Sequence, residues 1–209
     1  MPGDTEPCPS GDTVASRLAH QAYYEGASVV AFERLAGALE RAGAPEALVT
    51  RARAAATDEA RHAVLFADLA RRHGVAPMTL ESRAATPSLF ELALENATEG
   101  CVRETFGAIV TLHQASHAES EEIRAAFVAI AEDEAEHAAL SWELKAWFDT
   151  QLSPGERLYV QTAHDEAVAQ ARREAKTAPD APGLALGLPD SARAEQQLGA
   201  LMTAMAAAA

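Results

Sequence analysis

The five residues DEARH at positions 58–62 return as DEAEH at positions 133–137. In each copy a histidine follows a glutamate by three positions, and residues three apart lie on the same face of an α-helix. Apolar residues extend this face in both directions at steps of three and four. They are Leu48, Ala52, Ala55, Phe66 and Leu69 around the first copy, and Ile123, Phe127, Ile130 and Leu144 around the second. The pattern predicts that both motifs lie on helix faces turned toward the protein core.

The composition favours a soluble helical domain. Of the 209 residues, 48% are hydrophobic but only 5% are aromatic. Abundant alanine and scarce aromatic residues favour closely packed helices over a β-sandwich. The formal net charge of -14 argues against a nucleic-acid or anionic-membrane partner. No secretion signal is recognisable, and no apolar run approaches the roughly 18 residues of a membrane span. We therefore expect a cytoplasmic protein.

Helix-start and helix-stop signals divide the sequence into three parts. Residues 1–11 are rich in proline, glycine and acids and are expected to form a flexible tail. Residues 12–150 are expected to form four long helices that pack as one bundle. Residues 151–209 are expected to form a C-terminal helical extension that packs on this bundle.

The connection between the second and third helices indicates how the bundle is wound. Residues 75–86 can stretch to roughly 40 Å, and a helix of about 30 residues is roughly 45 Å long. The connection is thus nearly long enough to run the length of the bundle. The predicted fold class is all-α, a four-helix bundle with one long crossover connection.

The buried glutamates and histidines need a compensating partner, because an unpaired buried ion costs several kcal/mol. Two more glutamates lie in apolar helix stripes at matched distances. Glu25 precedes Glu59 by 34 positions, and Glu99 precedes Glu134 by 35. Glycine follows both Glu25 and Glu99. Glutamate and histidine on one helix face can bind divalent cations, so the sequence predicts a repeated metal-binding helical hairpin.

This set of residues resembles the ferritin-like di-metal carboxylate superfamily, in which two helices each give a glutamate and two others each give Glu-x-x-His. The resemblance covers residues 12–150. DEARH is similar to the D-E-x-R-H motif of bacterial di-iron hydroxylases, whereas the size and the two equal halves look more like rubrerythrin-type proteins. The resemblance implies a ferritin-like bundle that binds two iron ions, with manganese as the alternative metal.

The resemblance also implies a role for each matching residue. Two carboxylates would bridge the metals, and each metal would receive one further carboxylate and one histidine. The bridging residues would be Glu59 and Glu134, the ligands of one metal Glu25 and His62, and those of the other Glu99 and His137. Asp58 and Asp133 would orient the histidines, and Arg61 would support these aspartates.

Two glutamates of the third predicted helix compete for one position. Glu104 lies five residues after Glu99, which corresponds to a turn of about 140° on an α-helix. The apolar stripe and the repeat spacing favour Glu99. Glu104 is kept as an alternate ligand.

The implied function is that of a non-haem di-iron oxidoreductase, or its dimanganese or mixed-metal equivalent, that activates O2 or peroxide at a four-Glu/two-His site. The di-metal centre itself would be catalytic, so no separate catalytic residue is assigned. A small-molecule substrate would fit this chemistry, and the electron donor would be a separate protein because the sequence has no C-x-x-C pair. Two alternatives stay open: a ferroxidase or iron-binding protein without organic substrate, and a manganese-catalase-like peroxide enzyme. Oligomer formation is also open.

Overall fold

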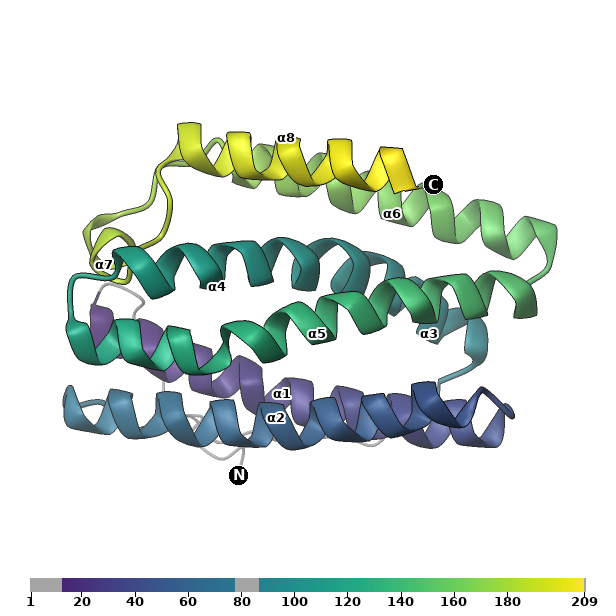
Figure 1. The fold of residues 1–209 in the computed structure, drawn as a ribbon, viewed down its shortest axis with the longest axis horizontal. Coiled ribbons are helices and arrows are strands. Elements are labelled where there is room, and N and C mark those ends of the chain that lie inside the picture. The colour runs from purple at the N-terminus through teal and green to yellow at the C-terminus, as the bar shows by residue number, and fades with distance from the viewer. Residues whose placement is uncertain (1–12, 78–86, 209) are drawn as a thin grey trace, which may run out of the picture.

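The computed structural model describes residues 13–77 and 87–208 (Figure 1). Within these ranges the regular structure is entirely helical, with no strand, so the all-α fold class is confirmed. The tail predicted for residues 1–11 lies outside the described residues. So does most of the predicted crossover connection, residues 78–86.

The helices form three layers in Figure 1: α1 with α2, then α3, η1 and α4 with α5, then α6 with α8. Contacts between α2 and α5 join the first two layers, and contacts of α6 with η1 and α3 join the third layer to the second. In chain order the helices are α1 (Val14–Arg41), α2 (Glu46–Arg72), α3 (Leu89–Glu95), the π-helix η1 (Asn96–Glu104), α4 (Thr105–His117), α5 (Glu121–Gln151), α6 (Pro154–Glu174), α7 (Ala181–Ala185) and α8 (Ser191–Ala208).

Side-chain caps begin several of these helices. The Thr13 side chain accepts a hydrogen bond from the backbone of α1. Ser88 and Ser153 each form a reciprocal capping box, with Glu91 and Glu156 respectively. Such caps satisfy backbone N–H groups that have no partner within the helix. These caps mark where α1, α3 and α6 begin.

The third predicted helix is not one regular α-helix. Between α3 and α4 the chain forms η1, a π-helix of 9 residues. A π-helix has i→i+5 hydrogen bonds and wider turns than an α-helix, and such segments are frequent at functional sites. The wider turns change which side chains of this segment face α5.

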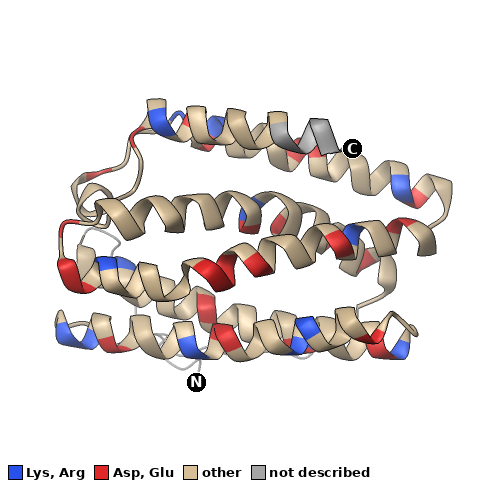
Figure 2. Ribbon diagram, in the orientation of Figure 1, with Lys and Arg blue, Asp and Glu red and all other residues tan. Residues whose placement is uncertain are grey.

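Two apolar clusters fill the core on either side of a polar centre. One cluster contains Leu39 of α1, Leu48 of α2 and Leu144 of α5. The other contains Leu18 of α1 and Phe66 of α2. In α1, α2 and α5 the glutamates and histidines of interest lie between these clusters along the chain. Figure 2 shows acidic residues gathered near the middle of these three helices.

The C-terminal helices share a smaller apolar cluster with the π-helix, in which Val102 packs with Val168 of α6 and Leu198 of α8. The division into a bundle at 12–150 and an extension at 151–209 stays a prediction. No described helix has the length and hydrophobicity needed to cross a membrane.

Gly100 is where the π-helix approaches α5 most closely. A Cβ atom at this position would lie 2.6 Å from Ser141 Oγ and 2.9 Å from Ser141 Cβ. Gly100→Ala is therefore expected to lower the free energy of unfolding by about 1–3 kcal/mol, as overpacking of a core does. Denaturant unfolding would measure this change.

Gly199 of α8 is the matched control, because a Cβ there would meet nothing within 4 Å. Gly199→Ala should raise the free energy of unfolding by about 0.5–1 kcal/mol through helix propensity. Adding Ser141→Gly to Gly100→Ala should restore part of the lost stability. Equal stability of Gly100→Ala and Gly199→Ala would contradict the close packing.

Candidate metal centre

Five of the six residues expected to bind metal come together between the two apolar clusters. Two overlapping groups have ligand atoms within 4.8 Å of one another. Glu59 belongs to both groups. The first group is Glu25, Glu59, His62 and Glu134, and the second is Glu59, Glu104 and His137. These side chains come from α1, α2, η1 and α5.

This cluster lies away from solvent. The relative exposures are 0% for His62, 1% for Glu59, 2% for His137, 5% for Glu25 and 9% for Glu134. Five of its buried atoms have no hydrogen-bond partner among the described residues: Glu59 Oε2, Glu134 Oε1, His62 Nδ1, His137 Nδ1 and His137 Nε2. Buried polar atoms are nearly always paired in folded proteins. Five such atoms in one place indicate an interaction with something besides the protein.

The two histidines direct Nδ1 toward the carboxylates from opposite helices. His62 Nδ1 lies 3.2 Å from Glu134 Oε1 and 3.8 Å from Glu25 Oε2. His137 Nδ1 lies 3.1 Å from Glu59 Oε1 and 3.8 Å from Glu104 Oε1. Each imidazole thus faces a glutamate from the partner copy of the motif as well as one from α1 or η1.

The other nitrogen of each histidine faces an aspartate on the opposite helix. His62 Nε2 lies 3.1 Å from Asp133 Oδ2, and His137 Nε2 lies 3.6 Å from Asp58 Oδ2. Arg61 Nη2 donates to both aspartates, at 2.7 Å to Asp133 and 3.1 Å to Asp58. Asp133 is therefore within hydrogen-bond distance of His62, whereas Asp58 lies beside His137 without a hydrogen bond to Nε2.

The electrostatics of the cluster favour bound protons when no cation is present. Burial by itself lowers the pKa of His62, but the carboxylates of Glu134, Glu25 and Asp133 raise it to about 10. Burial likewise lowers the pKa of His137, and Glu104 and Glu59 raise it to about 10. Burial raises the pKa of Glu59 to about 9, against the opposing effect of His137. A divalent cation would take the place of these protons.

Gln21, which is not among the predicted site residues, forms a hydrogen bond with Glu25. Gln21 Nε2 donates to Glu25 Oε1 at 2.6 Å. Burial raises the pKa of Glu25, but the neighbouring His62, Glu59 and Gln21 side chains together lower it. Gln21 precedes Glu25 by four positions on α1, a spacing at which helical side chains meet, so this partner was recognisable from the sequence.

The structure corrects the expected position of Glu99. Its side chain is 61% exposed and lies 3.6 Å from Arg103, whereas the Glu104 side chain is 25% exposed and belongs to the cluster. An α-helical stripe from Leu92 would carry Glu99 inward. In the π-helix the buried positions are instead Asn96, Ala97, Cys101 and Val102, so Glu99 faces solvent. A ligand role for Glu104 stays a prediction.

Hydrogen bonds to α5 fix the position of the π-helix. Asn96 Nδ2 donates to the Ser141 carbonyl oxygen at 2.9 Å, and Cys101 Sγ approaches the same oxygen at 3.4 Å. Ser141 follows His137 by one turn, and its hydroxyl donates to the His137 carbonyl oxygen at 3.1 Å. The segment that carries Glu104 is thus attached next to the histidine that Glu104 faces. Burial raises the pKa of Cys101 to about 12, so this thiol stays neutral.

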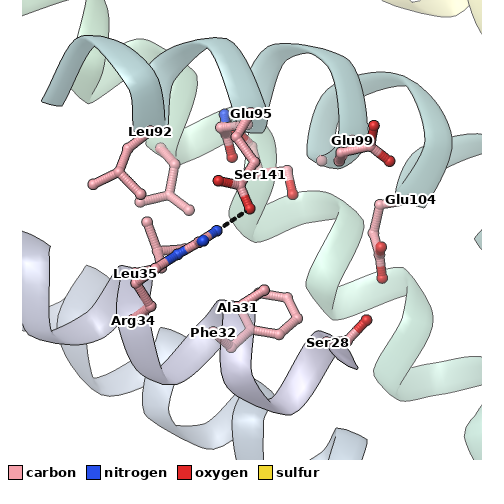
Figure 3. Close-up of a pocket in the computed structure, with 13 residues that line it drawn as sticks. Ser28, Ala31, Phe32, Arg34, Leu35, Leu92, Glu95, Glu99, Glu104 and Ser141 are labelled. Carbon is pink, nitrogen blue, oxygen red and sulfur yellow. Dashed lines mark hydrogen bonds and ion pairs between the residues drawn. The ribbon is translucent and has the colours of Figure 1, made fainter. Parts of the chain in front are cut away.

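A pocket of about 110 Å³ adjoins the Glu104 side of the cluster (Figure 3). Apolar side chains form much of its wall: Ala31, Phe32, Leu35, Leu92 and Leu144. Arg34 of α1 and Glu95 of α3 form an ion pair across it. Figure 3 shows the Glu104 side chain directed toward α1 and the Glu99 carboxylate directed away. A small molecule in this pocket would lie beside Glu104.

Comparison with known proteins identifies no relative: no family model, no curated protein and no solved structure matches the chain. The fold and the site therefore rest on the chain's own residues. They show an all-helical protein with buried Glu/His groups that could hold metal ions, an arrangement compatible with a ferritin-like fold.

Glu99 and Glu104 form a matched pair for testing the ligand set. Glu104→Ala is expected to weaken binding of one of two divalent ions by at least about tenfold, because it removes a carboxylate from the cluster. Glu99→Ala should leave both affinities within about twofold. Metal titration followed by calorimetry measures both variants. The opposite ranking would restore Glu99 as the ligand.

The stability of the metal-free protein is expected to fall as the pH rises above neutrality. The pKa values of His62 and His137 rise from 6.5 to about 10 on folding. The folded chain therefore binds more protons than the unfolded chain between these values, and the free energy of unfolding decreases with pH there. Each such proton contributes about 1.4 kcal/mol per pH unit.

Denaturant unfolding of metal-free protein at a series of pH values from about 6.5 to 9 tests this dependence. Replacing both histidines, in His62→Gln/His137→Gln, should flatten the decline because these protons can no longer be bound. An unchanged slope in this variant would show that the two imidazoles do not hold extra protons in the folded state.

Proposed function

We propose that this chain is a ferritin-like non-haem di-metal oxidoreductase that activates O2 or peroxide. Two helices would each supply one glutamate, and two others would each supply Glu-x-x-His, within a four-helix bundle. The proposed ligands are Glu25, Glu59, Glu104, Glu134, His62 and His137. Iron is the proposed metal, and manganese is the alternative because both accept carboxylate and imidazole ligands.

The unpaired buried atoms of the cluster carry this proposal. Glu59 Oε2, Glu134 Oε1, His62 Nδ1 and His137 Nδ1 lie in the core without hydrogen-bond partners. Leaving such groups unpaired costs about 1–3 kcal/mol each. Their types match a site for two cations, and the four glutamates would balance the charge of two divalent ions. The residues present therefore fit the group that the resemblance implies.

The residues around His62 and His137 would orient the two imidazole rings for metal binding. Asp133 and Asp58 lie next to Nε2 of His62 and His137 respectively. A proton held on Nε2 leaves the Nδ1 lone pair free for a cation. Arg61 joins both aspartates and so holds the two imidazoles in a common arrangement. Phe32 packs near the His137 ring, with a centroid distance of 5.3 Å, and limits access of water from that side.

When bound, two redox-active ions would supply the electrons for O2 or peroxide chemistry, while the protein sets their geometry. The apolar pocket beside Glu104 supports an enzyme over a metal carrier, because a carrier needs no room for a second reactant. The charge of the Arg34–Glu95 pair in its wall is internally balanced. The chain has only two cysteines and no C-x-x-C pair, so electrons would come from a separate donor.

Metal content is the first test of this function. Protein produced with iron or with manganese should contain about two ions per chain, as a di-metal site requires. The variant Glu59→Ala/His137→Ala should lose both ions, because Glu59 belongs to both groups of the cluster. Elemental analysis gives the stoichiometry. Less than about half an ion per chain with both metals would exclude a metal-dependent function.

Loaded protein is then reduced without oxygen and mixed with O2 or with peroxide. Consumption of many equivalents of oxidant in the presence of excess reductant would support an oxidoreductase. Disproportionation of peroxide by the manganese form alone would support the manganese-catalase-like alternative. A single oxidation of the metal without further turnover would support the ferroxidase alternative. The double variant is the control for metal in free solution.

A further inference from the structure

We propose that a second cavity, between α1, α4 and the segment that follows α7, binds a neutral amphipathic molecule of the alcohol or primary amide class. This cavity has a volume of about 270 Å³. Leu186 and Leu188, which follow α7, are among its lining residues, and Figure 1 shows α7 at one end of the helices. The cavity shares no lining residue with the pocket beside Glu104.

The chain after α6 forms one wall of this cavity and is held in place by several contacts. Arg17 Nη2 of α1 donates to Asp180 Oδ2 at 2.6 Å. Gln114 Nε2 of α4 donates to the Leu186 carbonyl oxygen at 3.0 Å. Gly187 has φ +76°, and a Cβ there would lie 2.4 Å from Ala118 N, so the turn requires glycine. The segment forms a fixed wall over the cavity.

Polar groups without partners face this space. Thr111 and Gln114 are only 8% and 7% exposed and both line the cavity. The Thr111 hydroxyl makes no hydrogen bond to any described residue. Of the seven other threonines in the described helices, all but Thr50 donate to a backbone carbonyl of the preceding turn: Thr57, Thr98, Thr105, Thr150, Thr162 and Thr203. The Thr111 hydroxyl is therefore free to form a hydrogen bond with a polar group that enters the cavity.

The lining contains further free acceptors and an apolar wall. Nε2 of Gln21 and of Gln114 each donate a hydrogen bond, while neither Oε1 accepts one from the described residues. The apolar side chains of the wall include Leu18, Phe66, Val110, Phe127, Leu186 and Leu188. A head group that both donates and accepts would satisfy Thr111 and the amide oxygens, and a hydrocarbon body would pack against the wall.

The charge of the lining decides the class of head group. Arg17 is the one charged residue among the described residues that line the cavity, and Asp180 pairs with it. Arg17 Nε has no hydrogen-bond partner among the described residues and can donate to a neutral oxygen. A carboxylate would meet a cation whose charge Asp180 already balances, and an ammonium group would find no free carboxylate among the described lining residues. Burial of an unpaired charge is costly, whereas a neutral hydroxyl or amide can be fully hydrogen-bonded.

The cavity volume sets the size of the occupant. An engineered cavity of about 150 Å³ accommodates benzene, so about 270 Å³ suits roughly ten non-hydrogen atoms. Octan-1-ol, with about nine, is a suitable test molecule. Octanoate and octylammonium carry the same chain with a charged head group.

The site can be tested without reference to metal chemistry. Gln21 lines the cavity and donates a hydrogen bond to Glu25. The Gln21 side chain would therefore lie between the occupant and the candidate metal centre. Binding itself, however, depends only on the cavity and its polar groups. Failure of metal binding and failure of this site are therefore distinguishable.

Calorimetric titration of the full chain with octan-1-ol is expected to show saturable binding to one site. Gly107 lines the cavity, and a Cβ at this position would meet nothing within 4 Å. Gly107→Leu should therefore fill the space and weaken binding by at least about tenfold. Gly199→Leu, on the exposed side of α8, is the matched control and should bind as the unaltered chain does.

Thr111→Val keeps the side-chain shape but removes the hydroxyl, and should weaken octan-1-ol binding about fivefold. Octanoate and octylammonium should bind at least about tenfold more weakly than octan-1-ol. Absence of saturable octan-1-ol binding, unchanged binding in Gly107→Leu, or tighter binding of either charged analogue would overturn the proposal.

Discussion

The rest of the structure depends on the burial of carboxylates and imidazoles in the middle of long helices. Each of α1, α2 and α5 carries its polar residues between two apolar segments. The apolar segments supply the packing that can bear the cost of burying charge. Because the polar residues face one another across the helices, the same packing also fixes their relative positions. The same apolar packing therefore determines both the stability of the fold and the geometry of the site.

The sequence predicts the all-α fold and the residues of α2 and α5 that face the core, because both copies of the motif lie in unbroken α-helix. There the spacing of Glu59 and His62, or of Glu134 and His137, translates directly into a shared face. Gln21 was recognisable by the same spacing. The periodicity of α1 likewise places Glu25 correctly.

The same reasoning fails in η1 because it assumes a constant number of residues per turn. Between Asn96 and Glu104 the turns widen, and the pairing of Asn96 with Ser141 and the close approach of Gly100 accompany this change. These contacts join positions more than 40 residues apart, which periodicity within one helix cannot reveal. Glu104 and the cavities likewise depend on such long-range packing.

Arg61 introduces a difference between two halves that otherwise match. It contacts both aspartates, whereas the second copy of the motif has Glu136 at the equivalent position. One half of the cluster includes the sealed Glu25, and the other includes the partly exposed Glu104. The two copies of the motif therefore lie in different surroundings, because one half of the cluster is buried and the other half is partly open to solvent. Substitutions in one copy are no longer interchangeable with those in the other, so each copy is free to diverge under its own constraints.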